Sequence, residues 1–300
     1  MTALAAVAVG CSSTERVETL PVHRAEYGSW AEIFADPQPV SVLVWNTGMI
    51  KADMKGLLNP KRPDSPEWNP RRDFVDVPVV LAQSEENGII LFDTGLNSSA
   101  GADSLKYVRG MLKSVIIDEM KQEKGQAVSE RLNELGMAPD YVFFTHLHFD
   151  HIGGAADLPS GITYVRGKDE REIRVPMLFD TEYLAHIRVF KEIDFTKAQS
   201  IPPFEQVVDI FGDSSVFAIN TAGHTKGHVS FLINALQGPL FVAGDALNIP
   251  ENVETGIGPG RYSWDMKMAQ EKMDAILGFL AMYPDVKLQM GHYCRETSTK

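Results

Sequence analysis

Residues 145–154 read Thr-His-Leu-His-Phe-Asp-His-Ile-Gly-Gly. Within six positions this stretch carries His146, His148, Asp150 and His151, although the chain of 300 residues has only 8 histidines. Neutral imidazoles and carboxylates are good ligands for zinc and similar divalent ions. In an extended segment His146 and His148 share a face and can reach one ion, whereas Asp150 and His151 point elsewhere. The spacing therefore favours two metal ions over one.

The flanking residues predict where this stretch lies in the fold. The apolar run 141–144 comes directly before it and is typical of a short buried strand. Gly153 and Gly154 follow, and glycine permits a tight turn and a close approach of backbone. We therefore expect the four ligand-type side chains on a loop at a strand end, the edge at which sites usually form in α/β architectures.

An apolar run that meets a glycine and then a histidine or aspartate recurs three times downstream. The apolar runs span residues 216–220, 240–243 and 286–290. They lead to His224, Asp245 and His292. One such occurrence alone would indicate only a turn. Three of them after a metal-type loop predict that side chains at other strand ends complete the site.

This set of motifs resembles the metallo-β-lactamase superfamily over about residues 40–295. The resemblance implies an α/β fold, an αβ/βα sandwich of two mixed sheets with helices outside, and a site for two divalent metal ions. The residues that would hold the first ion are His146, His148 and His224. Those that would hold the second are Asp150, His151 and His292, with Asp245 bridging both. Zinc is the metal expected first, with iron, manganese or cobalt as alternatives.

Two further residues take supporting roles from the same resemblance. The segments 77–82 and 88–92 predict a hairpin, because a Glu-Glu-Asn-Gly turn joins them. Asp93 follows the second strand, and the resemblance implies that it orients the metal loop without binding metal. His228 lies four residues after His224, and the resemblance gives it a structural role near the site.

The chemistry implied is metal-assisted hydrolysis, since two divalent ions can share a hydroxide that forms near neutral pH. Asp245 separates the chain from true β-lactamases of the superfamily, which lack a bridging aspartate there. The motifs His-Leu-His-Phe-Asp-His and Gly-His-Thr-x-Gly-His most resemble N-acyl-homoserine lactonases, which open a lactone ring in quorum quenching. Asp150 would then steer a proton to the leaving group. Asn248, where that group often has tyrosine, or Tyr262 would hold the substrate carbonyl, and Lys226 replaces a usual proline.

Several alternatives stay open within and outside this reading. The same fold hosts glyoxalase-II-like thioesterases and organophosphate or aryl ester hydrolases. The alternative of another class is a non-catalytic or scavenging lipoprotein that keeps the fold. A small-molecule ester or lactone is the expected partner. The net charge of −12 argues against nucleic acid, because phosphate backbones require a basic footprint. The chain could be a monomer or a homodimer.

The N-terminus has a pattern of its own. Residues 1–10 are small and apolar, and Cys11 follows. This resembles a bacterial lipoprotein signal, although no basic residue precedes the apolar run. We therefore expect residues 1–37 to be a signal-like N-terminus and linker, and residues 38–300 to be a single hydrolase domain. A lipid on Cys11 would attach the protein to a membrane in the periplasm or cell envelope; a secreted or cytoplasmic protein with an apolar terminus is the alternative.

The remaining segments give coarser expectations. Residues 46–72 read as a long irregular loop, which either packs its own apolar residues or forms a flap that supplies an apolar wall to the site. The spacing of apolar residues predicts helices within residues 103–136 and an amphipathic helix over 265–282. His186 and Cys294 are interpreted as packing residues, with pocket lining as the alternative for His186.

Overall fold

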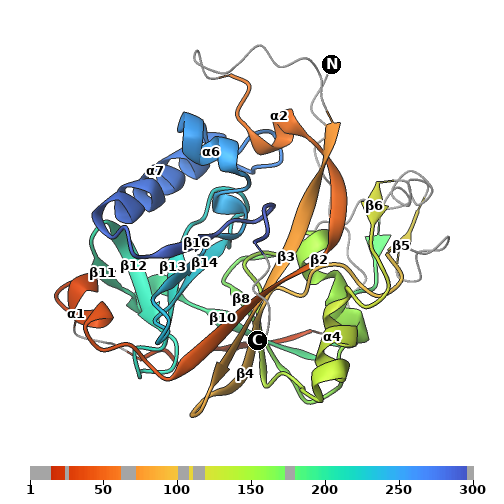
Figure 1. Ribbon diagram of the computed structural model, residues 1–300, viewed down its shortest axis with the longest axis horizontal. Helices are drawn as coiled ribbons and strands as arrows, with labels where there is room; N and C mark the ends of the chain where they lie inside the picture. The colour runs from red at the N-terminus through yellow and green to blue at the C-terminus, as the bar shows by residue number, and fades with distance from the viewer. Residues whose placement is uncertain are drawn as a thin grey trace.

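Two mixed β-sheets lie face to face at the centre of the computed structural model (Figure 1). The structure describes residues 15–23, 27–61, 72–100, 108–110, 119–172 and 180–295. The first sheet has eight strands in the order β1-β10-β8-β7-β4-β3-β2-β6, and the second has six in the order β11-β12-β13-β14-β15-β16. β5 and β9 form a small separate sheet. The predicted αβ/βα sandwich of two mixed sheets is confirmed.

The strands and helices have the following bounds. The first sheet contains β1 (Arg16–Thr19), β2 (Val40–Asp53), β3 (Arg72–Ser84), β4 (Gly88–Phe92), β6 (Met120–Lys121), β7 (Tyr141–Phe143), β8 (Thr163–Gly167) and β10 (Val189–Ile193). The second contains β11 (Gln199–Ile201), β12 (Phe204–Asp209), β13 (Val216–Asn220), β14 (Val229–Ile233), β15 (Leu240–Val242) and β16 (Lys287–Gln289). The small sheet pairs β5 (Val108–Arg109) with β9 (Asp180–Thr181). The helices are α1 (Trp30–Phe34), α2 (Met54–Leu57), α4 (Val128–Leu135), α5 (Phe149–Ile152), α6 (Pro250–Thr255) and α7 (Met266–Met282), with 3-10 turns η1 (Gly153–Asp157), η2 (Phe195–Lys197) and η3 (Gly244–Ala246).

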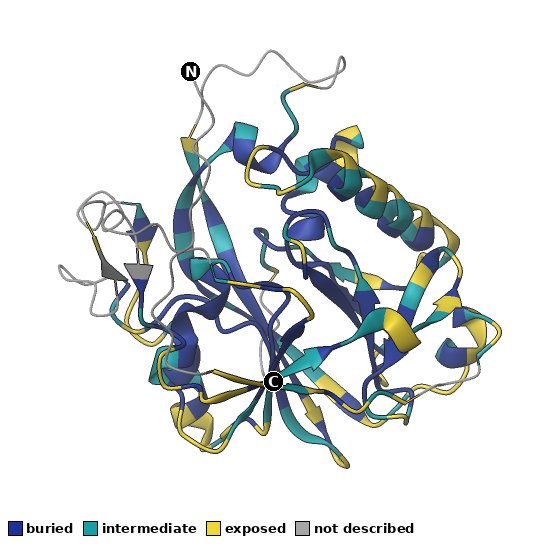
Figure 2. Cartoon of the chain, turned by 180° about the vertical axis from the view of Figure 1, so that it is seen from behind, coloured by how far each residue is buried: buried dark blue, intermediate teal, exposed yellow. Residues whose placement is uncertain are grey.

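The layers follow from the alternation of side chains along each strand. On β4, Ile90 and Phe92 face the second sheet, whereas Leu91 faces the outer layer. On β13, Ala218 faces the first sheet and Phe217 faces outward. Successive side chains of a strand point to opposite faces, so strands that are apolar throughout bury both. The buried colour in Figure 2 accordingly runs through the centre of both sheets.

Helices close the two outer faces (Figure 1). α7 buries Met273, Ile276 and Phe279 in a cluster with Trp30 of α1 and side chains of the second sheet. α4 belongs to the outer cluster of the first sheet. The apolar residues of α7 recur three apart, which places one stripe of the helix against the sheet. The amphipathic helix predicted over 265–282 is thereby confirmed, as is the hairpin of β3 and β4.

The segment 46–72 differs from the predicted irregular loop. β2 continues to Asp53, and its second part pairs with the start of β3 beyond a register shift between Asn46 and Met49. α2 follows directly, and residues 62–71 lie outside the described part of the chain. Ile50 and Ala52 are buried and alternate with half-buried polar residues. This alternation is too short to predict a strand by itself. The segment becomes part of β2 because it pairs with residues of β3 that come more than twenty positions later.

The segment 103–136 is only partly helical where the structure describes it. α4 is the helix found there, whereas β5 and β6 are short strands. Residues 103–107 and 111–118 of the predicted helices lie outside the described residues. The prediction was wrong at β5 and β6, because pairing of β5 with β9 and of β6 with the extended β2 overrides the local helical spacing.

The folded body begins before the expected boundary at residue 38. β1 adds to the edge of the first sheet beside β10, and Trp30 of α1 is fully buried in the outer cluster of the second. Residues 1–14, which include Cys11, lie outside the described residues, so the lipoprotein signal stays a prediction. In the part of the chain that the structure describes, no helix has the length and apolar character needed to cross a membrane.

Candidate metal centre

The loop after β7 carries four of the predicted ligands. His148 is the N-cap of α5, and Asp150 and His151 lie within that helix. Gly154 lies where an added Cβ would come within 2.2 Å of the carbonyl oxygen of Thr94. Gly154 therefore permits the close backbone approach that the sequence predicts, and the metal loop packs against Thr94 in the segment after β4.

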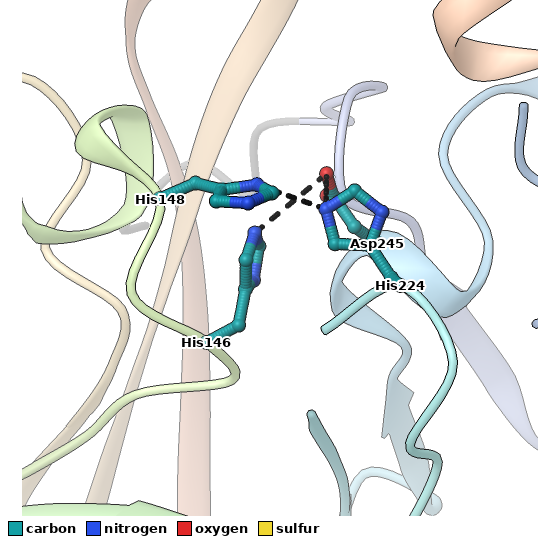
Figure 3. Close-up of side chains that lie close together, drawn as sticks. All are labelled: His146, His148, His224 and Asp245. Atoms are coloured by element: carbon teal, nitrogen blue, oxygen red, sulfur yellow. Dashed lines mark hydrogen bonds and ion pairs between the residues drawn. The ribbon is translucent and has the colours of Figure 1, made fainter. Parts of the chain in front are cut away.

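His146, His148, His224 and Asp245 form the first group of ligand-type side chains, whose ligand atoms lie within 4.8 Å of one another (Figure 3). The Nε2 atom of His224 is 2.9 Å from Nδ1 of His148 and 3.2 Å from Oδ2 of Asp245. His146 Nε2 is 3.8 Å from the same Asp245 oxygen. His224 comes from the loop between β13 and β14, so this group joins the two sheets.

Asp150, His151 and His292 form the second group. Asp150 Oδ2 is 3.7 Å from His151 Nε2 and 3.6 Å from His292 Nε2. Asp245 lies against this group as well, with Oδ1 3.3 Å from His151 Nε2 and Oδ2 3.3 Å from His292 Nε2. The structure thus brings together all seven side chains predicted as ligands and places Asp245 between the two groups.

The donor set fits two divalent ions. Ligand atoms at zinc-bonding distances around a tetrahedral ion lie about 3.3–3.6 Å apart, close to the separations found in both groups. Buried polar atoms ordinarily have hydrogen-bond partners, yet those without one among the described residues include Nε2 of His146, Nε2 of His151 and Oδ1 of Asp245. These atoms need a group that accepts their lone pairs, and a dinuclear metal site supplies one.

The two groups differ in how readily their imidazoles take up a proton. Burial lowers the pKa of His146 and His224 well below the usual value and also lowers that of His148. Burial acts in the same direction on His151, but the neighbouring carboxylates outweigh it and raise its pKa well above the usual value. The pKa of His292 is raised by the same balance of burial against Asp245 and Asp150.

Asp93 holds the metal loop in the way expected for a supporting residue. Its Oδ1 accepts a hydrogen bond from the backbone of Thr145 at 2.7 Å, and Oδ2 accepts one from the Thr145 hydroxyl at 2.8 Å. Oδ2 also lies 2.8 Å from Nδ1 of His151. Asp93 has a φ of 61°, a left-handed conformation that is uncommon for residues other than glycine but that aspartate tolerates better than most. The contact fixes the imidazole ring so that Nε2 of His151 faces Asp150 and Asp245.

His228 belongs to a hydrogen-bond chain that fixes Asp245. Its Nε2 accepts from the backbone N–H of Asp245 at 3.1 Å, so Nδ1 carries the proton and donates to Thr221 Oγ1 at 2.8 Å. Thr221 lies 2.9 Å from Ser230 Oγ, which donates to the carbonyl of Ala243. Burial lowers the pKa of His228 to about 3, which keeps this single-proton state. These hydrogen bonds give His228 the structural role that was predicted for it.

A cavity of about 440 Å³ opens beside both groups. Its polar floor includes His148, Asp150, His224, Asp245 and His292. Its apolar wall consists of Ile50, Ala52, Leu57, Met120 and Phe149. Three of these wall residues come from β2 and α2, so the segment 46–72 does supply an apolar wall, although as a strand and a helix. Met120 and Phe149 were not predicted as site residues: Met120 lies in no motif, and Phe149 is an apolar residue between ligands of the metal loop.

The two candidates for holding a substrate carbonyl are placed differently. Tyr262 lines the cavity, and its hydroxyl oxygen accepts a hydrogen bond from the backbone of Asp53 at 3.0 Å, so its own proton can be donated elsewhere. Asn248 is 1% exposed, is not among the cavity-lining residues and donates its Nδ2 to the carbonyl of Leu57 at 3.3 Å. The structure therefore gives Asn248 a structural position: it ties the loop after Asp245 to α2.

His186 and Cys294 belong to neither ligand group. His186 Nε2 is 3.2 Å from the hydroxyl of Tyr164, and both line a groove of the first sheet's outer layer, so the pocket-lining alternative fits His186. Cys294 is half-buried and packs against the core between the sheets, in agreement with its interpretation as a packing residue.

Comparison with known proteins gives relatives of several kinds. The chain is 28% identical to an N-acyl homoserine lactonase of a Bacillus species over 211 residues, which are 67% of this chain and 76% of that protein. It is 29% identical to the N-acyl homoserine lactonase AttM of Agrobacterium fabrum over 147 residues, covering 46% and 54%. A match of 27% identity to the cytochrome P450 monooxygenase mpaDE of Penicillium brevicompactum spans 45% of the chain but only 18% of that protein.

Solved structures and the family comparison agree on the fold. The crystal structure of a quorum-quenching N-acyl homoserine lactone lactonase superposes with a TM-score of 0.65 at 20% identity, covering 87% of this chain and 98% of the other. At that identity the likeness concerns the fold. The family model of the metallo-β-lactamase superfamily matches residues 72–283, more than half of the chain. The chain belongs to the metallo-β-lactamase superfamily.

Proposed function

We propose that this protein is a dinuclear metal hydrolase that opens the ring of N-acyl-homoserine lactones. The observation that carries the proposal is the placement of two metal-ligand groups, joined by Asp245, at the polar floor of a cavity with an apolar wall. Its curated relatives from Bacillus and Agrobacterium fabrum bear the name N-acyl homoserine lactonase. We propose zinc as the metal, since imidazoles and carboxylates suit it.

The metal pair would supply two things when bound: a water of lowered pKa as nucleophile, and polarisation of the ester carbonyl. The chain would supply the rest. Asp245 sets the separation of the two groups, because its oxygens face both. Asp150 lines the cavity, where its carboxylate can carry a proton to the leaving alcohol. The hydroxyl of Tyr262 would donate a hydrogen bond to the carbonyl or ring oxygen of the substrate.

The cavity supports the proposed substrate class. Its volume lies within the range of about 300–1,000 Å³ that is usual for sites of small molecules. The apolar wall formed by β2, α2 and Phe149 suits an acyl chain, while the polar ring would lie over the metal groups.

The test is proton release by the purified, zinc-loaded protein on four substrates. They are an N-acyl-homoserine lactone, a glutathione thioester, a β-lactam and a phosphotriester. We expect preferential turnover of the lactone, loss of turnover in Asp245→Asn, and full turnover in Asp285→Asn, which makes the same change at an exposed position. Turnover of the thioester or the phosphotriester with a silent lactone would overturn the lactonase assignment. Elemental analysis of the purified protein tests zinc against iron, manganese and cobalt.

A further inference from the structure

Glu170 is a buried carboxylate that takes no part in either ligand group. It lies just after β8 and is 1% exposed. A buried carboxylate is costly unless hydrogen bonds satisfy it. Its partners therefore indicate what the residue holds in place.

Three donors converge on this one carboxylate. Oε1 accepts a hydrogen bond from the backbone N–H of Leu147 at 3.0 Å. Oε2 accepts one from the hydroxyl of Thr225 at 2.6 Å and another from the backbone N–H of Gly227 at 3.0 Å. The two oxygens thus divide between two segments that are almost eighty residues apart in the sequence.

These two segments carry the three imidazoles of the first group. Leu147 lies between His146 and His148 in the loop after β7 of the first sheet. Thr225 comes directly after His224, in the loop between β13 and β14 of the second sheet. Glu170 therefore connects the histidine pair of one sheet to the single histidine of the other.

The backbone around Glu170 leaves little freedom for this connection to shift. An added Cβ at Gly227 would lie 2.5 Å from the backbone nitrogen of Glu170 and 2.6 Å from the carbonyl oxygen of Lys168. An added Cβ at Gly167 would lie 1.9 Å from the carbonyl oxygen of Gly227. The turn that carries Glu170 and the loop that carries His224 are thus in direct backbone contact.

We propose that Glu170 is a positioning residue for the first metal, because it sets the separation between the His146–His148 pair and His224. This inference rests on the proposed dinuclear site. Supporting hydrogen bonds of this kind typically change metal affinity by about 10- to 100-fold. Glu170 acts through the ligand loops and does not line the cavity at the metal groups.

The substitution Glu170→Gln is nearly isosteric and removes one acceptor. Whichever way the amide turns, its NH₂ group faces either the N–H of Leu147 or the donors of the His224 loop, and two donors repel. We expect this variant to retain one tightly bound zinc ion per chain and to bind the other about 10- to 100-fold more weakly.

The experiment is a zinc titration of the full-length protein against a competing chelator, with cobalt spectra to follow the ligand field of each ion. Asp194→Asn is the matched control. Asp194 pairs at 2.9 Å with Lys168, which lies in the turn that carries Glu170, and it is not bonded to Leu147, Thr225 or Gly227. Thr225→Val removes one of the three hydrogen bonds and should weaken the first ion less, and Thr225→Ser should restore it.

The outcomes separate the inference from the proposed function. Selective weakening of one ion in Glu170→Gln, absent in Asp194→Asn, supports the positioning role even if the wild type is silent on lactones. Wild-type affinity for both ions in a folded Glu170→Gln overturns it, as does a wild type that binds no metal. If Glu170→Gln does not fold, Thr225→Val decides: weaker binding of one ion supports the role, and unchanged binding overturns it.

Discussion

The two metal-ligand groups share Asp245 but differ in their electrostatic surroundings. In the first group burial dominates and lowers the pKa of all three imidazoles. In the second group carboxylates dominate and raise the pKa of His151 and His292. A metal ion binds neutral imidazole, so protons compete with it less in the first group, where the pKa values are lowered, than in the second, where they are raised. The difference predicts unequal affinity at two positions only a few ångströms apart.

The largest effect is expected where the two groups meet. Asp245→Asn removes the charge that faces both groups, so we expect loss of both ions and a fall in lactone kcat/KM of about 10³-fold or more, or about 4 kcal/mol. Metal content per chain and proton-release kinetics measure it. Retention of two ions would show that the groups do not depend on this carboxylate.

Asp93→Asn tests the second group alone. Asp93 contacts His151 but no side chain of the first group other than through Thr145. We expect zinc affinity to fall about 10- to 100-fold at the second group with a smaller change at the first. A chelator competition with two resolved steps gives the measurement, and an equal loss in both steps would contradict the separation of the groups.

Lowering the pH should empty the second group first. A raised pKa means that the proton persists to higher pH, so protons compete with metal at His151 and His292 before they compete at His146 and His224. For each proton displaced, apparent affinity should fall about tenfold per pH unit below that pKa. Zinc content after dialysis at stepped pH should fall from two ions per chain to one before reaching zero. Loss of both ions in a single step would refute the comparison.

The smallest effect is expected from a change in the series of hydrogen bonds that runs from the backbone of Asp245 through His228 to Thr221 and Ser230. Thr221→Val leaves the Nδ1 proton of His228 and the hydroxyl of Ser230 without this partner, at a cost of about 1–3 kcal/mol in the free energy of unfolding. Because these hydrogen bonds act on Asp245, both groups should lose affinity equally. Urea unfolding and zinc titration measure the two effects, and Thr221→Ser, which keeps the hydroxyl, is the control.

Local sequence was sufficient for the elements whose signal is complete within a few residues. The loop from His146 to His151 concentrates four ligands beside a strand, and α7 shows its apolar stripe over many turns. The three later ligands, His224, Asp245 and His292, each follow a strand and a glycine. Their grouping with the first loop came from resemblance, because no spacing along the chain says which strand ends meet.

Only the tertiary structure decided what depends on partners far apart in the sequence. β2 continues past Asn46 because β3 pairs with it, and Asn248 turns inward because Leu57 offers a carbonyl. In the sequence Glu170 looks like an ordinary charged residue of a turn. Its role appears only in the folded structure, where two loops from different sheets place three donors around it. Local patterns specify strands, helices and ligand types, whereas long-range hydrogen bonds form only after the sheets have packed and therefore leave no periodic signal in the sequence.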